Sequence, residues 1–507
     1  MLSRAAVLSL SVTLLIATAV ACGGGDDAAN ADPGGGSSGN PGQDGGPNGG
    51  GDGSTTNPGQ DSGEPLPQAK GDPCAGGVPV PDDQHYHAPD VCVRLVATAV
   101  PGSIRQLMFA PNGDLFGQSG DGSIWLMRDE DGDGFFSKAE VHKWATTGGN
   151  GNNAHVDAAG GFVYAGSNGG VQRFAYDPNS FKGGAAQDVV VNQPTGGHSK
   201  HTTHVYDGFL YVHSGSSGNA THETGGPDYD TKRSLIKRFD LSKFNGTAFT
   251  WDQGEVVAVG IRNGNGFARN EITKKIYDVS HGLDNVTYNG VNLSQGAPLH
   301  DDNPGEQVME IAPGKKYGYP FCWTAQRVSV SGNVKTPGTQ LANEQYGSNP
   351  HDDAWCATNS EKPTTFLQAH SAPMDITFFD KQPIGALPEK WRGGAFITFH
   401  GAWNRETLKL TGFKVVWQPF NADGSAPNPT STATDTTFPY ETVFSAGTVA
   451  GGEVQAKNGW SWSDQASGMG DAKVRPVGVA VGPIDGALYF SSDEGSSNVY
   501  RVGLVKK

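Results

Sequence analysis

Short runs of alternating apolar and polar residues, separated by glycine-containing turns, recur along most of the chain after its first seventy or so residues. One unit reads Leu107-Met-Phe-Ala-Pro-Asn-Gly-Asp-Leu-Phe-Gly and is followed by Gly122-Ser-Ile-Trp-Leu-Met. The theme returns within residues 156–174, 206–239, 395–416 and 477–502. Asn-Gly and Asp-Gly pairs between such runs are typical of tight β-hairpins. Because helical periodicity is almost absent, the sequence predicts an all-β fold.

Repetition of a four-strand unit favours a β-propeller, in which each unit forms one blade. We predict that residues 73–507 form a six-bladed β-propeller, since this length accommodates six blades with some long loops; seven blades are the alternative. Propellers carry many functions, so the fold alone does not indicate one.

The N-terminus has the features of an export signal. Residues 1–4 carry one positive charge, residues 5–17 are largely apolar but too short for a comfortable membrane span, and Ala19-Val20-Ala21 offers small residues at a cleavage site. We therefore expect residues 1–21 to be a signal peptide. Cys22 follows directly, which predicts lipidation of its thiol, although Ala-Val-Ala also suits cleavage by ordinary signal peptidase.

Residues 22–72 are rich in Gly, Pro and Asp, and up to about residue 71 they contain no aromatic residue. Such a segment cannot bury enough apolar surface to offset the entropy of ordering it, so we expect a disordered tether. With Cys22 acylated, the tether would hold the exported propeller at the bacterial cell envelope, in the periplasm, at the outer membrane or on the cell surface.

The chain contains five cysteines. Lipidation of Cys22 would account for one, and the other four allow three disulfide connectivities. Because an exported chain meets an oxidising compartment, we expect the pairs nearest in sequence, Cys74 with Cys92 and Cys322 with Cys356. Four buried free thiols are the less favoured alternative.

An acidic segment matches the template of a calcium-binding loop. The ligand positions fall on Asp129, Asp131, Asp133, Phe135 (through its carbonyl), Ser137 and Glu140, with Gly134 at the sharp turn. We interpret it as a structural calcium site on a loop of the first blade. A solvated acidic turn is the alternative.

The segment Gly196-Gly-His-Ser199, with Asp207-Gly-Phe-Leu-Tyr-Val212 and Gly215-Ser-Ser217 after it, resembles the soluble quinoprotein sugar dehydrogenases. These are the glucose, sorbosone and pyranose dehydrogenases that use pyrroloquinoline quinone (PQQ). Four further matches stand in the family's order: Gly260-Ile-Arg-Asn263, Tyr317-Gly-Tyr-Pro320, Phe399-His-Gly-Ala-Trp-Asn-Arg405 and Arg475-Pro-Val-Gly478.

The resemblance implies a quinone over the central axis of the propeller, with His198 as catalytic base and Arg262 stabilising the charge that develops. It also implies cofactor contacts from Arg105, Gln106, Asn263, His400 and Arg475, and an active-site calcium on the carbonyls of Gly282 and Leu283. His400 stands where glucose dehydrogenases have a lysine nearby, so glucose specificity does not carry over. His201 and His204 are interpreted as polar surface residues or neighbours of His198.

A net charge of −16 argues against a nucleic-acid partner. Three arginines and a calcium ion would nevertheless suit PQQ, which carries three carboxylates. The expected function is PQQ-dependent oxidation of a sugar or related alcohol, with an electron acceptor that the sequence does not name. A non-catalytic surface lipoprotein that binds carbohydrate or a protein partner is the alternative. A calcium-dependent lactonase-type propeller is less favoured, because its inward acidic and asparagine ligands are not found in order.

Overall fold

The structure is a computed structural model that describes a large part of the chain. The described ranges are 66–80, 85–148, 154–157, 160–199, 202–292, 299–330, 333–402, 411–421, 424, 427, 438, 440–446, 448–450, 453–455, 474–493 and 497–506. The predicted signal peptide, the lipidation site Cys22, most of the predicted tether, and His201 lie outside these residues.

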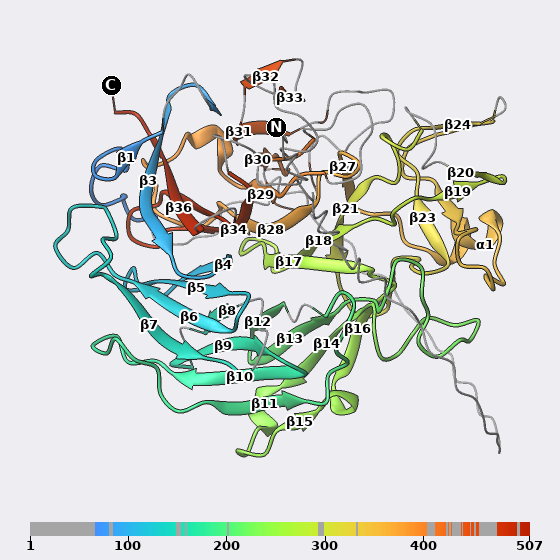
Figure 1. Cartoon of the computed structure of the whole chain (residues 1–507), viewed down its shortest axis with the longest axis horizontal. Coiled ribbons are helices and arrows are strands. Elements are labelled where there is room, and N and C mark those ends of the chain that lie inside the picture. Colours follow the sequence, from blue (N-terminus) through green and yellow to red (C-terminus); the bar gives the residue numbers. More distant parts are fainter. Residues whose placement is uncertain are drawn as a thin grey trace, which may run out of the picture. The chain divides into compact units, whose positions relative to one another are not determined.

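Six β-sheets are arranged around a common centre, and their innermost strands lie around the middle of Figure 1. The first blade has the order β4 (Ile104–Phe109), β5 (Leu115–Ser119), β6 (Ser123–Met127) and β7 (Val141–Thr146). The second has β8 (Ala154–Asp157), β9 (Phe162–Ser167), β10 (Gly170–Ala175) and β11 (Gln187–Val191), with β15 (Phe249–Thr250) outside. The third has β12 (Thr203–Tyr206), β13 (Phe209–Ser214), β14 (Leu235–Asp240) and β16 (Glu255–Val259), with β22 (Lys315–Lys316) outside.

The remaining sheets follow the same plan. The fourth blade has β17 (Asn263–Arg269), β18 (Ile276–His281), β21 (Glu306–Ile311) and β27 (Thr365–Leu367). The fifth has β28 (Pro373–Phe378), β29 (Ala395–Phe399), β30 (Lys414–Gln418) and β31 (Glu441–Ser445), with β2 (Tyr86–His87) outside. The sixth has β34 (Pro476–Val481), β35 (Leu488–Ser492), β36 (Ser497–Leu504) and β3 (Val91–Val100), with β1 (Val78–Pro79) outside. The prediction of a six-bladed propeller is confirmed.

The sixth blade combines strands from both ends of the described chain. β3 pairs antiparallel with β36, so that Val91 lies opposite Leu504. The segment before β3 also packs on the propeller, because the Ala69 amide donates to the Ile384 carbonyl at 2.9 Å and a disulfide joins Cys74 to Cys92. The packed region therefore begins before the predicted boundary at residue 73.

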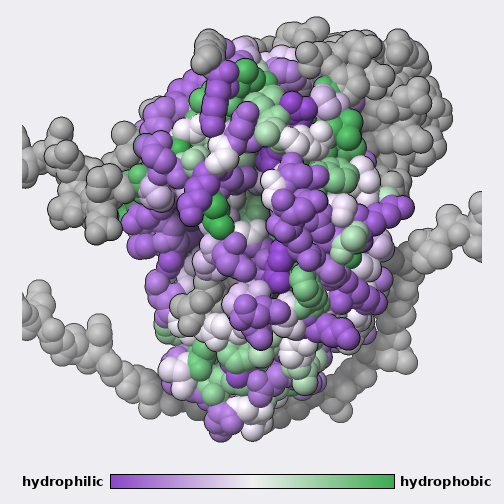
Figure 2. All heavy atoms as spheres, turned by 90° about the vertical axis from the view of Figure 1, so that its left-hand side faces the viewer, coloured by the Kyte–Doolittle hydropathy of each residue, from purple (hydrophilic) through white to green (hydrophobic). Residues whose placement is uncertain are grey.

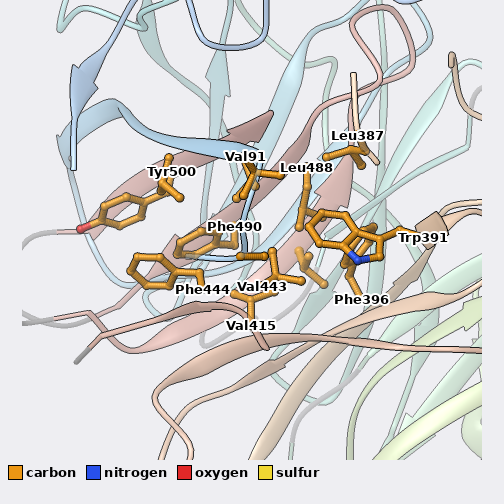
Figure 3. Packing of buried hydrophobic residues seen from close by; sticks show 14 of the residues in the cluster. Val91, Leu387, Trp391, Phe396, Val415, Val443, Phe444, Leu488, Phe490 and Tyr500 are labelled. Atoms are coloured by element: carbon orange, nitrogen blue, oxygen red, sulfur yellow. The ribbon is translucent and has the colours of Figure 1, made fainter. Parts of the chain in front are cut away.

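Each space between neighbouring blades is filled by its own apolar cluster. Figure 3 shows the cluster between the fifth and sixth blades: Phe444 packs with Phe490 and Tyr500 at one end, and Trp391 packs with Phe396 at the other. Since a blade packs against a neighbour on both of its faces, central strands such as β5, β29 and β35 are buried along their whole length. Burial of this kind, which removes apolar surface from water, holds the ring of blades together.

The loops add smaller elements outside the blades. These are β19 (Thr287–Tyr288), β20 (Val291–Asn292), β23 (Cys322–Thr324), β24 (Val328–Val330), β25 (Asn333–Lys335), β26 (Gln340–Ala342), β32 (Thr448–Ala450), β33 (Glu453–Gln455), the helix α1 (Asp353–Asn359), and 3₁₀ turns at Leu241–Lys243, Trp251–Gln253 and Glu389–Trp391. The second disulfide joins Cys322 to Cys356, so both expected pairings are confirmed.

Figure 2 shows the left-hand side of Figure 1, and the described residues that it draws in colour form no large apolar region. Hydrophilic residues predominate there, and apolar residues occur in small separate groups. Within the described part of the chain, no helix is both long and apolar enough to cross a bilayer.

Candidate active site

Residues from five blades line a cavity of about 230 Å³ at one face of the propeller. Its wall comprises Arg105, His198, Arg262, His281, Gly282, Leu283, Asp284, Pro304, Glu306, His370, Ala372, Met374, His400, Gly401 and Arg475. Most of these residues stand at the start of an innermost strand or just after the second strand of a blade. Because neighbouring strands in a blade are antiparallel, these two positions share one face of the ring. The fold thereby brings together seven of the residues that the sequence predicts for the site.

His198 is fixed by Ser216, which follows β13. The His198 amide donates to the Ser216 carbonyl at 2.8 Å, and the imidazole Nδ1 lies 2.8 Å from Ser216 Oγ. Ser216 Oγ also donates to the Gly218 carbonyl at 2.7 Å, so it accepts from the imidazole. Nδ1 therefore carries the hydrogen, and Nε2 is the unprotonated nitrogen of this tautomer.

Arg262 is buried, and its guanidinium is held from two sides. Nη2 donates to Asn219 Oδ1 at 2.9 Å and to Asp284 Oδ2 at 2.8 Å, while Nε donates to the Asn219 carbonyl at 3.2 Å. Tyr319, from the Tyr-Gly-Tyr-Pro motif, donates to the Gly218 carbonyl and so supports the loop that carries Asn219. Asn219 and Asp284 leave the guanidinium little rotational freedom.

A second charged group joins the first, fifth and sixth blades. Asp493 lies 2.8 Å from Arg105 Nη2 and 2.7 Å from His400 Nε2, and Arg475 Nη2 donates to His400 Nδ1 at 2.9 Å. Burial lowers the pKa of His400 to about 4, against the opposing charge of Asp493. Burial alone would raise the pKa of Asp493, but His400 and the two arginines hold it well below its usual range. A neutral imidazole beside an ionised carboxylate agrees with both hydrogen bonds.

Gly282 and Leu283, the predicted calcium stretch, lie beside a buried carboxyl. The Gly282 amide donates to Glu306 Oε2 at 2.6 Å, and the Ala372 amide donates to Glu306 Oε1 at 3.3 Å. Burial raises the pKa of Glu306 to about 8, although these two amides oppose the shift. His370 and Ala372 nearby have positive φ angles of 62° and 54°, a strained conformation that is common at functional sites.

Two predicted cofactor residues do not line the cavity. Gln106 is 1% exposed, and its Nε2 lies 3.5 Å from His204 Nε2 inside the propeller. β4 begins at Ile104, so Arg105 and Gln106 lie within the strand instead of preceding it, and the pairing with β5 shifts register between Ile104 and Gln106. Asn263 donates to His281 Nδ1 at 3.1 Å and so lies behind that cavity residue. Of the two alternatives for His204, the polar surface residue is wrong, because His204 is 4% exposed and lies between Gln106 and Phe267.

A model of the TrAA12-like family matches residues 87–503, which is most of the chain and nearly all of the propeller. The chain belongs to this family. The TrAA12-like match starts just before β3 and ends within β36, so it spans the complete ring of blades.

Two curated relatives share part of this TrAA12-like chain. A pyrroloquinoline quinone-dependent pyranose dehydrogenase from Coprinopsis cinerea is 28% identical over 340 residues, which cover 63% of this chain and 41% of the relative. A pyrroloquinoline quinone-dependent sugar dehydrogenase from Hypocrea jecorina is 27% identical over 264 residues, or 49% of this chain and 57% of the relative. The chain thus matches about two fifths of the length of the first relative.

Solved structures show the same fold. The holo PQQ domain of the Coprinopsis cinerea pyranose dehydrogenase superposes with a TM-score of 0.68 at 23% identity, covering 85% of this chain and 99% of the domain. A calcium structure of a Trichoderma reesei enzyme of carbohydrate-active enzyme family AA12 gives 0.66 at 23% identity, with coverages of 83% and 97%. At these identities the likeness shows the fold alone.

Several site residues were not found from the sequence. Ser216, Asn219, Asp284, Glu306 and Asp493 all contact a predicted site residue. Asp493 follows the second strand of its blade, as His400 does, so comparison of equivalent blade positions was an available signal. Ser216 and Asn219 stand within the Gly-Ser-Ser-Gly-Asn segment that follows the histidine motif.

The predicted calcium loop lies between β6 and β7, on the first blade as expected. One carboxylate oxygen from each of Asp129, Asp131 and Asp133 lies within 4.8 Å of the others, and all three residues are exposed. The oxygens of Glu140 accept from the amides of Glu130 and Ser137 at 2.7 and 2.8 Å. Glu140 therefore braces the loop in this conformation.

Proposed function

We propose that this chain is a PQQ-dependent dehydrogenase that oxidises a sugar or a related alcohol, with His198 as general base. The observation that carries the proposal is the convergence of His198, three arginines and the Gly282-Leu283 stretch on one cavity. The names of the two curated relatives, which are PQQ-dependent pyranose and sugar dehydrogenases, support it.

The charges around the cavity suit an anionic cofactor. Arg105, Arg262 and Arg475 bring three positive charges, and the paired carboxylates of Asp284 and Asp493 offset two of them. One calcium ion would raise the net charge from one to three positive charges, equal in size to the charge of the three PQQ carboxylates. Arginine binds carboxylates through charge-assisted hydrogen bonds, so Arg105 and Arg475 would hold them.

The substrate hydroxyl would give its proton to His198 Nε2, the unprotonated nitrogen. As the imidazole becomes positively charged, Nδ1–H continues to donate to Ser216 Oγ, so the ring keeps its orientation. Arg262, held by Asn219 and Asp284, presents a fixed positive charge where negative charge develops. When bound, PQQ would supply the acceptor for the hydride from the substrate carbon, and the product would be a lactone or an acid.

We further propose two calcium sites with different roles. Gly282 and Leu283 would offer backbone carbonyls to a calcium ion in the cavity, beside the carboxyl groups of Asp284 and Glu306. That ion would supply Lewis acidity toward the cofactor. The loop of Asp129, Asp131 and Asp133 would bind a second, structural ion. Cys22, if lipidated, would anchor the protein to a membrane.

The test is titration of purified protein with PQQ and calcium, followed by dye reduction with a panel of aldoses. We expect saturable binding at one equivalent and sugar-dependent reduction. His198→Ala should bind PQQ normally and lose about a thousandfold in kcat, because a general base contributes on that order. Arg262→Ala should lose both activity and some affinity.

Lack of PQQ binding at large excess would overturn the proposal and leave a binding propeller. Binding without oxidation of any sugar or alcohol would do so as well. Arg128→Ala is a matched control, because Arg128 pairs with Asp114 on the first blade away from the cavity. It should leave binding and kcat unchanged.

A further inference from the structure

Arg233 is a buried cation in the third blade that stands just before β14. Arg233 is 4% exposed, and none of the described carboxylates forms an ion pair with it. The guanidinium donates instead to four backbone carbonyls. Nε bonds to Gly215 at 2.8 Å, Nη1 to Thr195 at 2.9 Å, and Nη2 to Gly196 and, at 3.3 Å, to Ser216.

These carbonyls belong to two segments that meet at His198. Thr195 and Gly196 begin the turn that delivers the histidine, and Gly215 and Ser216 follow β13. Ser216 then bonds His198 through both its carbonyl and its hydroxyl, and its amide donates to the Arg262 carbonyl at 2.9 Å. Arg233 thus ties together the two backbone segments that set the position of His198 relative to Arg262.

Glycines make this close approach possible. A Cβ on Gly215 would lie 2.4 Å from the His198 carbonyl oxygen, and one on Gly197 would lie 2.3 Å from the Ser217 carbonyl oxygen. Gly196 and Gly197 also have positive φ angles of 83° and 57°, which other residues rarely adopt. The turn is held by the two hydrogen bonds between His198 and Ser216 and by those that Arg233 donates to Thr195 and Gly196.

The guanidinium suits this task better than other side chains. It has five N–H groups in a rigid plane and stays charged when buried, so it can serve several carbonyls at once. Asp230 holds the backbone at Arg233, because Asp230 Oδ1 accepts from the amides of Lys232 and Arg233 at 2.7 and 3.2 Å. Arg233 does not line the cavity, so it has no direct contact with substrate or cofactor.

We propose that Arg233 is a positioning residue that fixes the turn bearing His198 through four backbone carbonyls, and thereby holds the base in reach of the substrate. The kinetic part of this inference rests on the proposed function. The structural part does not, because the hydrogen bonds exist whatever the reaction is.

The experiment compares Arg233→Met with Lys237→Met. Lys237 is a matched control: it is also 4% exposed, belongs to the same blade, and donates to a backbone carbonyl, that of Trp251 at 3.1 Å, remote from His198. Amide hydrogen exchange of peptides that contain His198 and Ser216 is measured in both variants. We expect exchange about tenfold faster or more in Arg233→Met and unchanged in Lys237→Met.

Kinetics separate positioning from general stability. In Arg233→Met we expect kcat to fall about 10- to 100-fold, because small displacements of a catalytic group have effects of that size, while PQQ affinity and KM stay near wild type. Arg105 and Arg475, which come from other blades, would still bind the cofactor. Arg233→Lys should recover part of kcat, since an ammonium can serve only some of the carbonyls.

Wild-type exchange at His198 and Ser216 together with wild-type kcat in Arg233→Met would overturn the proposal. If Arg233→Met does not fold, amide exchange is measured in Arg233→Lys instead. Reduced protection of His198 and Ser216 in that variant would support the proposal, and wild-type protection would overturn it. If the wild-type protein oxidises no sugar, the proposed function fails, and the exchange data alone decide on the role of Arg233.

Discussion

The cavities on the two faces of the propeller differ in how many blades line them. On the face with the candidate active site, Asp493 of the sixth blade contacts Arg105 of the first and His400 of the fifth, and Asn219 of the third contacts Arg262, which leads into the fourth. On the opposite face, a cavity of about 340 Å³ lies beside the acidic loop and is lined by residues of the first and sixth blades and of the segment before β3. Its pair of Arg128 and Asp114 belongs to one blade, while elsewhere on that face Arg269 of the fourth blade pairs with Asp207 of the third.

The larger cavity is therefore not the one with the candidate chemistry. The cavity on the opposite face is lined in part by tight turns between first and second strands, such as Asn112–Asp114 and Pro483–Asp485. The first of these turns also meets the second blade, because Tyr176 Oη donates to Asp114 Oδ2 at 2.6 Å. The described loops of the active-site face that follow β13 and β18 carry Asn219 and Asp284 to Arg262. Among the described residues, the cavity on this face therefore draws its groups from five blades.

The largest expected effect tests the difference between the faces directly. Arg475→Gln should weaken PQQ binding about 10- to 100-fold, since a hydrogen bond to a charged group contributes about 1.5–3 kcal/mol. Arg128→Gln, on the opposite face, should leave binding unchanged. Isothermal titration in the presence of calcium measures both. Equal losses in the two variants would mean that the effect is not specific to the active-site face.

A smaller effect concerns Asp278 on β18, which takes no part in the charged pairs described above for either face. Among the described residues neither of its oxygens has a hydrogen-bond partner, and burial raises its pKa well above the usual value. When the pKa of a carboxyl is higher in the folded state than in the unfolded state, the protein loses stability as pH rises above the unfolded-state pKa. Asp278→Asn should therefore become more stable relative to wild type between pH 5 and 8, by on the order of 1 kcal/mol.

Asp114 should behave in the opposite way. Burial alone would raise its pKa, but hydrogen bonds from Arg128, Tyr176 and Asn112 lower it. Its contribution to stability is present above its unfolded-state pKa and is lost as pH falls through the folded-state pKa. Asp114→Asn should destabilise at pH 7 and less so at pH 3, as measured by urea unfolding. The same sign of pH dependence in both variants would contradict the assignments.

The smallest expected effect concerns the acidic loop. Removal of calcium from the loop should lower the melting temperature by on the order of 1 °C, so Asp131→Asn should reduce the calcium dependence of the melting temperature without changing kcat in cofactor-loaded protein. Asp177→Asn, which alters an exposed aspartate in another turn, is the control. Calorimetry with and without added calcium measures the shift. An unchanged calcium response in Asp131→Asn would exclude the loop as the site.

Much of the fold could be predicted because its signals are local. Alternation and turn residues mark the hairpins, and the predicted turn at Asp207-Gly208 joins β12 to β13 with φ angles of 51° and 80°. Residues at the starts of innermost strands, such as His198 and Arg262, were found through motifs of a few residues. The pairing of β3 with β36 was not predicted, since no local pattern specifies a partner so far along the chain.

The contacts within the site were harder to predict for the same reason. Asp493 contacts Arg105 because the sixth blade lies beside the first, and Glu306 on β21 accepts from the Gly282 amide because the two segments meet in the folded chain. Arg233 resembles any arginine before a strand until its four carbonyl partners are known. Gln106 follows a register shift in the pairing of β4 with β5, which no local pattern indicates.

The pairing of β3 with β36 also governs when the ring can form. β3 is made among the first strands, yet its partner lies at the end of the chain. Until β36 is available, β3 presents an unpaired edge, and nothing joins it to β35 in the sixth blade. Closure of the propeller therefore has to wait for β36, and loss of this strand would separate β3 from β34 and β35.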